Sequence, residues 1–310
     1  MSRYAEIQNF VSIVDAGSLS RASRRSGLAV SAVSKRLKDL ELRTGATLIN
    51  RSTRKLSLTD AGRDFYYRCK QIIADLDEAE LNLQEATCGL KGRIRIAAPV
   101  TFSELHLAPL LNDFMVLHQD VEIDLDLNDR QVDVIDEGFD LAIRIGRLSD
   151  SSLIARRLTR IRHIPAASPA LLERFGHPQH PEDLKDYPML QYRPSQQITN
   201  WDFERPDGSR GTARLNSRFV CNNGSILTNA AAAALGIIIE PTFICSPLIL
   251  SGVLEPLFPD HIWSDNAAFA IYPAGRAVPR RVRALVDHLA TGLSPEPHWD
   301  RDLMRRYPLK

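Results

Sequence analysis

The sequence predicts an α+β multidomain protein with a small basic helical domain, one long helix and a larger α/β part. At about 150 residues per domain, the 310 residues correspond to roughly two globular units. Apolar residues repeat at helical period as far as Thr87, and β-like runs alternate with helical segments after Arg93. Residues 1–60 carry 11 Lys and Arg against 5 Asp and Glu, whereas the remainder carries 28 against 33. This asymmetry indicates a basic, partner-binding N-terminal end.

The composition excludes several classes of protein. The chain is 44% apolar and 25% charged, with 16 Gly and 18 Pro, which is ordinary soluble usage and excludes a largely disordered or fibrous chain. The longest apolar stretch, residues 230–239, is half the roughly 20 residues that a membrane span needs. The N-terminus has no signal-peptide core. We therefore expect a cytoplasmic protein with no membrane association.

Neither a metal nor a disulfide is expected. The four cysteines are far apart in the sequence and form no Cys-x-x-Cys pair. His177 and His180 lie on a Pro-rich loop without a third metal ligand nearby in the sequence. We therefore interpret them as two loop histidines and not as a metal site. The serines, histidines and acids show no nucleophile elbow and no Gly-rich phosphate loop. No cofactor and no catalytic residue is predicted.

Three short helices are expected in the first 45 residues. Ile7, Phe10, Val11 and Val14 repeat at helical spacing within 4–16, and Gly17 ends that helix. A second helix follows Ser18 as N-cap and ends near Gly27. The third runs from about Ser31 to Thr44 and stops at Gly45.

The third helix has two distinct faces. Its apolar face is formed by Val33, Leu37 and Leu40. Its polar face contains hydrogen-bond donors and no acidic residue. These side chains are spaced three and four residues apart, at Ser31, Ser34, Lys35 and Lys38. In a helix-turn-helix, the second helix enters the major groove with its N-terminal residues against base edges. The polar face therefore predicts DNA binding, the alternative being a solvated amphipathic helix.

A basic hairpin follows. Residues 48–51 and 55–58 are two short strand-like runs, and the turn between them is flanked by Arg51, Arg54 and Lys55. Phosphate contacts supply much of the affinity for DNA. The hairpin is therefore predicted to be a wing that binds the DNA backbone.

A long helix is expected from Thr59 to about Thr87. Its apolar residues are spaced 4, 3, 4, 3, 4 and 3 apart, at Phe65, Cys69, Ile72, Leu76, Ala79, Leu83 and Ala86. This is the a/d repeat of a coiled coil. We expect a dimer seam, the alternative being a helix that packs on its own domain, and a hinge at 88–92.

The N-terminal motifs resemble the LysR-type transcriptional regulators. The resemblance rests on 17–22, 31–37, Leu40-Glu41, Gly45, Leu48, Arg51, Arg54 and 58–62. It continues through 98–102, 137–146, 150–153, 222–224 and 235–237, and covers about residues 3–293.

The resemblance implies a winged helix-turn-helix domain at 1–59, a linker and dimerisation helix with hinge at 60–91, and an effector-binding domain at 92–293. That domain is expected to have the two-lobed periplasmic-binding-protein-like fold, with lobe I at about 92–165 and 267–293 and lobe II at about 166–266. The strands that cross between the lobes are expected near 162–168 and 266–272. The remaining tail, 294–310, is expected to be surface-bound or loose.

The resemblance also implies site residues and assembly. Base-reading positions correspond to Val30, Ser31, Ser34 and Lys35, with Arg51 and Arg54 on the wing. Many relatives carry Ser at the position of Ala29 and Gln or Pro at that of Val30, so a helix cap and a base donor are missing here. Val30 can contact only a thymine methyl. A tetramer made of two dimers is implied, with RNA polymerase as a possible partner.

A cleft between two lobes is the expected effector site. Backbone N–H groups after the first strand favour an anion, and residues 222–225 occupy the equivalent place in the second lobe. The candidate effector-binding residues are Pro99, Val100, Thr101, Phe102, Arg144, Asn223 and Gly224. Several of these could instead be helix caps, Arg144 could form an internal salt bridge, and Trp201 and Phe203 could be pocket or core residues.

The predicted function is a sequence-specific DNA-binding transcriptional regulator controlled by a small-molecule effector. The protein is expected to bind double-stranded DNA as a homo-oligomer. The alternative is a cytoplasmic solute-binding or enzymatic α/β protein whose basic segment only dimerises, because fold alone does not define function.

Overall fold

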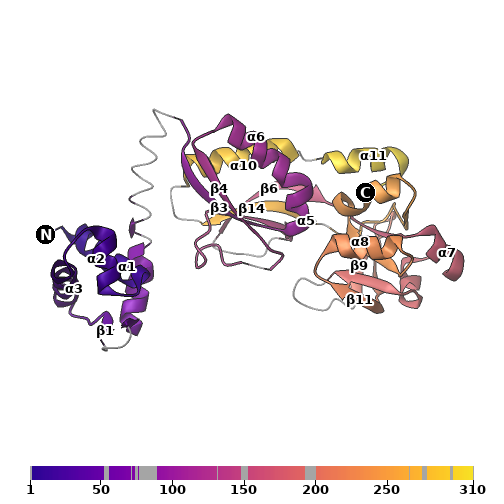
Figure 1. The fold of residues 1–310 in the computed structure, drawn as a ribbon. Helices are drawn as coiled ribbons and strands as arrows, with labels where there is room; N and C mark the ends of the chain where they lie inside the picture. The colour runs from indigo at the N-terminus through magenta and orange to yellow at the C-terminus, as the bar shows by residue number, and fades with distance from the viewer. Residues whose placement is uncertain are drawn as a thin grey trace. The chain divides into compact units, whose positions relative to one another are not determined.

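The computed structural model describes residues 2–51, 56–70, 72–73, 76, 89–130, 132–147, 153–192, 200–264, 266–273, 278–293 and 296–309. The chain divides into two compact units, Met1–Cys88 and Gly89–Lys310 (Figure 1).

The N-terminal unit begins with three helices, as expected. They are α1 Arg3–Ala16, α2 Leu19–Ser26 and α3 Val30–Thr44. Each is followed by a glycine in the left-handed conformation that ends a helix, namely Gly17, Gly27 and Gly45. The Ser18 hydroxyl accepts a hydrogen bond from the backbone N–H of Arg21 and caps α2. Ala29 gives α3 no side-chain cap.

Two strands form the hairpin. β1 Ile49–Arg51 and β2 Leu56–Leu58 pair antiparallel, with Ile49 opposite Leu58. The expected basic tip falls at residues 52–55, so Arg54 and Lys55 lie outside the described residues, as does the side chain of Arg51.

The next helix begins at 60 and is tied to β1. The Thr59 hydroxyl accepts from the backbone N–H of Gly62 at 2.9 Å, and the Thr59 N–H donates to the Leu48 carbonyl at 3.1 Å. A Cβ at Gly62 would lie 1.9 Å from that carbonyl oxygen, so only glycine permits this close approach.

The expected dimer seam on this helix divides into two parts. Phe65 and Cys69 pack into the core of the N-terminal unit, with Cys69 only 1% exposed, so the packing alternative is correct for these two positions. Ile72 and Leu76 are 53% and 41% exposed, and the remaining heptad positions lie outside the described residues.

The C-terminal unit contains two five-stranded sheets. The first has the order β4-β3-β5-β14-β6. Its strands are β3 Gly92–Ala98, β4 Val121–Leu127, β5 Leu141–Gly146, β6 Leu153–Ile161 and β14 Asn266–Pro273. The helix expected at 106–117 begins earlier, as α5 Val100–Phe102, the π-turn η1 Ser103–Leu107 and α6 Ala108–Leu117. Helix α10 Arg280–Leu293 lies beside α6 (Figure 1).

The second sheet has the order β11-β8-β12-β7-β13. Its strands are β7 His163–Ala167, β8 Met189–Tyr192, β11 Ser217–Cys221, β12 Ile237–Pro241 and β13 Glu255–Pro256. The accompanying elements are α7 Pro169–Phe175, η2 Pro181–Asp186, α8 Gly224–Ala232, α9 Thr242–Leu250 and the hairpin β9 Asn200–Glu204 with β10 Arg210–Arg214. We refer to the parts built on the first and second sheets as lobe I and lobe II.

The chain passes between the sheets at two places. Only Arg162 separates β6 from β7, and β7 pairs with β12 of the second sheet from His163 onward. Lobe II therefore takes its first strand three residues before the expected boundary at 166. The return to lobe I follows Trp263, which is packed in the core of lobe II, and precedes β14, which pairs with β5 and β6 along its length. This crossing therefore lies just before the expected 266–272.

The C-terminal segment is not loose. Residues 298–306 form α11 His298–Arg306. Trp299 is packed in the core of lobe I, whereas Leu303 is packed in a core cluster of lobe II. Arg162 donates to Asp300 Oδ2 at 2.7 Å and also contacts Glu296 at 3.2 Å. Of the two expected settings, a loose tail is therefore wrong for the described residues 296–309, because burial of Trp299, Asp300 and Leu303 fixes α11 on the domain.

Candidate functional site

The polar face of α3 is exposed. Val30 is 45% exposed, Ser31, Lys35 and Lys38 are also exposed, and Ser34 is half-buried. The first turn of α3 contains no acidic residue. The whole face is therefore open to a partner and carries positive charge.

Buried polar contacts hold this helix in place. Asn9 of α1 donates from Nδ2 to the Val33 carbonyl at 3.0 Å, in a buried setting. Glu41 accepts the backbone N–H groups of Leu48 and Ile49 at 2.9 and 3.3 Å, which ties the start of the hairpin to α3. The apolar residues Val33, Leu37 and Leu40, each at most 1% exposed, complete the anchor.

Further cations lie on the preceding helix. Arg21, Arg24 and Arg25 of α2 are exposed. Sequence reasoning concentrated on α3 and the hairpin and did not single out these residues. The signal for them was the cluster of arginines within 21–25, because arginine side chains commonly contact DNA phosphates.

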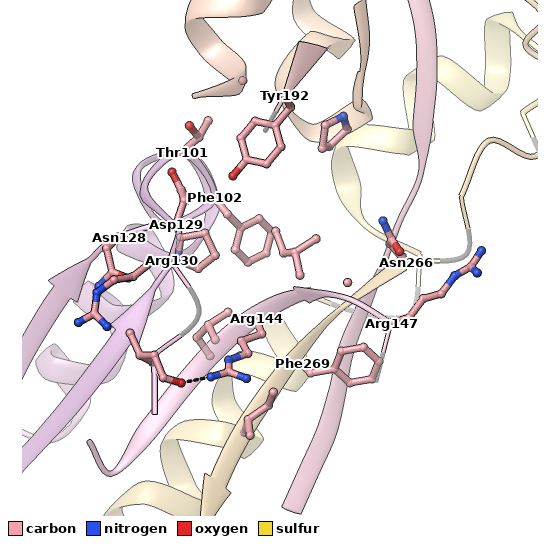
Figure 2. Close-up of a pocket in the computed structure, with 18 of the residues that line it drawn as sticks. Thr101, Phe102, Asn128, Asp129, Arg130, Arg144, Arg147, Tyr192, Asn266 and Phe269 are labelled. Carbon is pink, nitrogen blue, oxygen red and sulfur yellow. Dashed lines mark hydrogen bonds between the residues drawn. The ribbon is translucent and has the colours of Figure 1, made fainter. Parts of the chain in front are cut away.

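The C-terminal unit contains a large cavity between its two sheets. Its volume is about 880 Å³. Lobe I supplies residues from the segments that follow β3 and β4, from β5 and from β14, and lobe II supplies residues from β7, β8 and β12 (Figure 2). Five of the seven expected effector residues line it, namely Pro99, Thr101, Phe102, Arg144 and Gly224.

Val100 and Asn223 do not line the cavity. The Val100 N–H donates to Asp129 Oδ1 at 3.2 Å. An acid of the protein itself thus occupies the place where a ligand anion was expected. The Asn223 side chain accepts from the Ile226 N–H at 3.1 Å and caps α8.

Arg144 lies on β5, opposite Phe269 of β14. Its guanidinium donates to the Val132 carbonyl (Figure 2). Its Nε is buried and has no hydrogen-bond partner among the described residues. Burial lowers the pKa of Arg144, opposed by the charge of Asp133. Within the described part of the chain, no acid forms an ion pair with Arg144, so the expected alternative of an internal salt bridge is not seen there.

Glu240 on β12 is the main cavity residue that sequence reasoning missed. It is 1% exposed, and its Oε1 has no hydrogen-bond partner among described residues. Burial raises its pKa to about 8, so the carboxyl is largely protonated at neutral pH. A Cβ at Gly224 would lie 2.6 Å from Glu240 Oε2, so the carboxyl packs closely against the start of α8. The only sequence signal was an acid at the end of an apolar strand.

The wall from lobe II is otherwise uncharged. His163 lines the cavity, contacts Ser264 Oγ through Nδ1 at 2.7 Å, and has its pKa lowered to about 4 by burial. Trp201 also lines the cavity, whereas Phe203 is packed in the core of lobe II. Burial, with smaller contributions from Asp129 and Glu240, raises the pKa of Tyr192. In Figure 2, Tyr192 lies on the same side of the cavity as Thr101 and Asp129.

The histidine pair and the cysteines do not form a further site among the described residues. His177 Nε2 contacts Glu255 Oε1 at 3.2 Å, and the described residues hold no cluster of three potential metal ligands. The cysteines at 69, 221 and 245 are free thiols. None of the described helices is both long and apolar enough to cross a membrane.

An exposed basic helix after a short turn, joined to a two-lobed domain with a central cavity, defines a class of ligand-responsive DNA-binding proteins. Residues 4–63 match the lysR family of bacterial regulatory helix-turn-helix proteins, and residues 88–294 match the LysR substrate binding domain. The chain therefore belongs to the LysR family of transcriptional regulators and contains an effector-binding domain.

Individual relatives agree over nearly the whole chain. An HTH-type transcriptional regulator of Haemophilus influenzae is 34% identical, covering 92% of this chain and 99% of the relative. The structure of CrgA, a LysR-type regulator from Neisseria meningitidis, matches with a TM-score of 0.60 and 29% identity, covering 95% of this chain and all of that one. The structure of the Vibrio cholerae virulence activator AphB matches with a TM-score of 0.60 and 26% identity, covering 94% and 99%.

Proposed function

We propose that this regulator reads its operator with the first turns of α3. Ser31, Ser34 and Lys35 contact base edges in the major groove, and Val30 contacts a thymine methyl. The observation that carries this proposal is the exposed, acid-free face of α3. Lys38, with Arg51, Arg54 and Lys55 of the hairpin, contacts the DNA backbone.

Pairing of two copies of the protein matches the two-fold symmetry expected of the operator. Two copies pair through the exposed positions of the helix that begins at 60, and two such dimers form a tetramer. Each dimer then presents two copies of α3 to half-sites about 34 Å apart or a multiple of that distance. The exposure of Ile72 and Leu76 supports this pairing.

The ligand acts through the cavity between the lobes. A small molecule that binds one lobe arrangement more tightly than another shifts the assembly toward it, typically by about 1 to 3 kcal/mol. Transcription then changes through access of RNA polymerase to the promoter. The protein acts as a cytoplasmic regulator and not as an enzyme, in agreement with its regulatory relatives.

The test is a selection of bound genomic fragments followed by gel shifts. The double variant Ser34→Ala, Lys35→Ala is expected to lose roughly 1 to 3 kcal/mol of operator discrimination for each base contact. Random DNA should be affected much less. Lys70→Ala, which removes an exposed cation from the same unit, should leave operator discrimination unchanged.

A salt titration measures the phosphate contacts. Six or more contacts predict a slope of about −5 or steeper in log K against log salt. Equal losses on operator and random DNA would show that Ser34 and Lys35 read no bases. Failure of the wild type to bind any duplex at low salt would reject the proposal and favour the solute-binding or enzymatic alternative.

A further inference from the structure

The cavity contains a half-buried cation, Arg144, that has no counterion among the described residues. Arg144 has no acidic partner within ion-pair distance in the described part of the chain, and its Nε is enclosed without a hydrogen-bond acceptor. A buried charge is costly unless it is paired and hydrogen-bonded. Arg144 lies on β5, a central strand between β3 and β14, and its side chain is half-buried in the cavity wall. This arrangement leaves one coordination position of the guanidinium for a ligand.

The neighbouring acid does not fill that position. Asp133 is the charge that most favours the cationic form of Arg144. Its Oδ1 accepts the backbone N–H groups of Ile135 and Asp136, both at 3.0 Å. One carboxylate oxygen of Asp133 is therefore engaged within its own turn, and no ion pair between Asp133 and Arg144 is found among the described residues.

The other cations of the cavity are paired or exposed. Arg130 forms a two-pronged ion pair with Glu137. Arg147 is exposed at the cavity rim, where solvent screens a charge. Among the described residues, Arg144 is thus the one half-buried cation of the cavity that lacks an anion.

The lobe II wall offers no second cation. His163 is enclosed and neutral, and Glu240 is enclosed beside Gly224. Both therefore accommodate uncharged groups. Between these polar points the lining is mainly apolar, and it includes Phe102, Phe243, Phe269 and Ile271. A second negative charge on the ligand would find no desolvated partner there.

We propose that the effector is a small organic monoanion with a largely apolar body, whose carboxylate is held by the guanidinium of Arg144. This proposal rests on the proposed function and specifies its ligand class. Arginine and carboxylate form charge-assisted hydrogen bonds that add geometric specificity. The apolar body packs on Phe269, the neighbour of Arg144 on β14, and extends toward lobe II.

The test compares matched acids and amides on the full-length protein. The probes are benzoate, phenylacetate and hexanoate, each paired with benzamide, phenylacetamide or hexanamide. At least one acid should raise the Tm of the wild type and bind in calorimetry, and its amide should bind far more weakly. Losing the charge-assisted contact corresponds to a roughly 10- to 100-fold weaker Kd.

Variants assign the effect to Arg144. Arg144→Gln should weaken binding of the acid by about the same 10- to 100-fold and leave amide binding unchanged. Arg156→Gln is the matched control, because Arg156 lies on β6 of the same sheet, pairs with Asp287 and does not line the cavity. If Arg144→Gln does not fold, Arg144→Lys keeps the charge without the planar fork and should show an intermediate loss.

Three outcomes would overturn the proposal. They are equal binding of acid and amide, wild-type affinity in Arg144→Gln, and no binding of any acid in the panel. Gel shifts on the operator, run without ligand, distinguish the two proposals. A protein that shifts DNA but binds no acid contradicts only the ligand class, whereas a protein that shifts no DNA contradicts the proposed function itself.

Discussion

The cations of α2 and α3 have different surroundings from the charged residues at the lobe crossing and in the cavity of the C-terminal unit. In the N-terminal unit, Lys35 and Lys38 of α3 and the arginines of α2 are exposed to solvent. In the C-terminal unit, Arg162, Glu240 and Asp300 are each at most 5% exposed. Exposed cations contribute little to stability and serve association with a charged partner. Buried charges affect the free energy of unfolding directly, so the same residue types have different consequences in the two units.

The largest effect is expected from breaking the ion pair at the lobe crossing. Asp300→Ala leaves Arg162 buried and removes the carboxylate at 2.7 Å, whereas the half-exposed Glu296 stays at 3.2 Å. The C-terminal unit should lose about 3 kcal/mol of unfolding free energy, because removing one partner of a buried ion pair is expensive. Urea denaturation of the full-length protein measures this loss.

The double variant Arg162→Met, Asp300→Leu is the control for this prediction. Replacing both partners by apolar residues removes the two buried charges and should recover most of the stability that Asp300→Ala loses. If Asp300→Ala were as stable as wild type, the ion pair would not contribute to stability. The proposed difference between exposed and buried charges would then be contradicted.

A smaller, pH-dependent effect is expected at Glu240. Its pKa rises from 4.5 to about 8 in the folded protein. Between these values the unfolded chain releases a proton that the folded chain retains, so this group reduces stability as pH rises from about 4.5 to 8. Glu240→Gln removes that decline. The variant should therefore exceed wild type by about 1 to 3 kcal/mol at pH 7 and match it near pH 4.

Thermal unfolding as a function of pH checks this prediction. His163, with its pKa lowered to about 4, makes both proteins lose stability as pH falls from about 6.5 to 4, and it cancels in the difference. Glu122→Gln, at an exposed position of β4, should follow the wild-type curve. A constant offset between Glu240→Gln and wild type would show that burial does not perturb Glu240.

The smallest effect concerns the start of α3. Ala29 is in extended conformation at the N-cap and provides no side-chain acceptor. Ala29→Ser should stabilise the N-terminal unit by about 0.5 to 1 kcal/mol, because a serine hydroxyl can accept an unpaired N–H of the first turn. Calorimetry of the N-terminal transition measures the gain. Ala32→Ser, inside the first turn, should give a slight loss instead, and equal effects at both positions would contradict the capping argument.

The two units also differ in how far their sites were predictable from sequence. Helix α3 and its polar face follow from periodicity and from the glycines that end the helices, which are local signals. Thr101 and Phe102 could be proposed because they follow a strand. Glu240 and His163 could not be proposed as cavity residues. For Glu240, the segment Ile237–Pro241 has the pattern of an ordinary core strand, and the burial of this acid depends on contacts with α8. The role of α11 was missed because its anchors, Trp299 and Leu303, enter separate cores.

The link between Arg162 and Asp300 has a consequence for biosynthesis. The two residues are 138 positions apart in the chain, and Arg162 lies where the first sheet passes into the second. While the ribosome is still making the intervening segment, this arginine has no access to Asp300, and Trp299 and Leu303 are not yet available to either core. The effector-binding domain therefore completes its folding only after the C-terminal helix has left the exit tunnel.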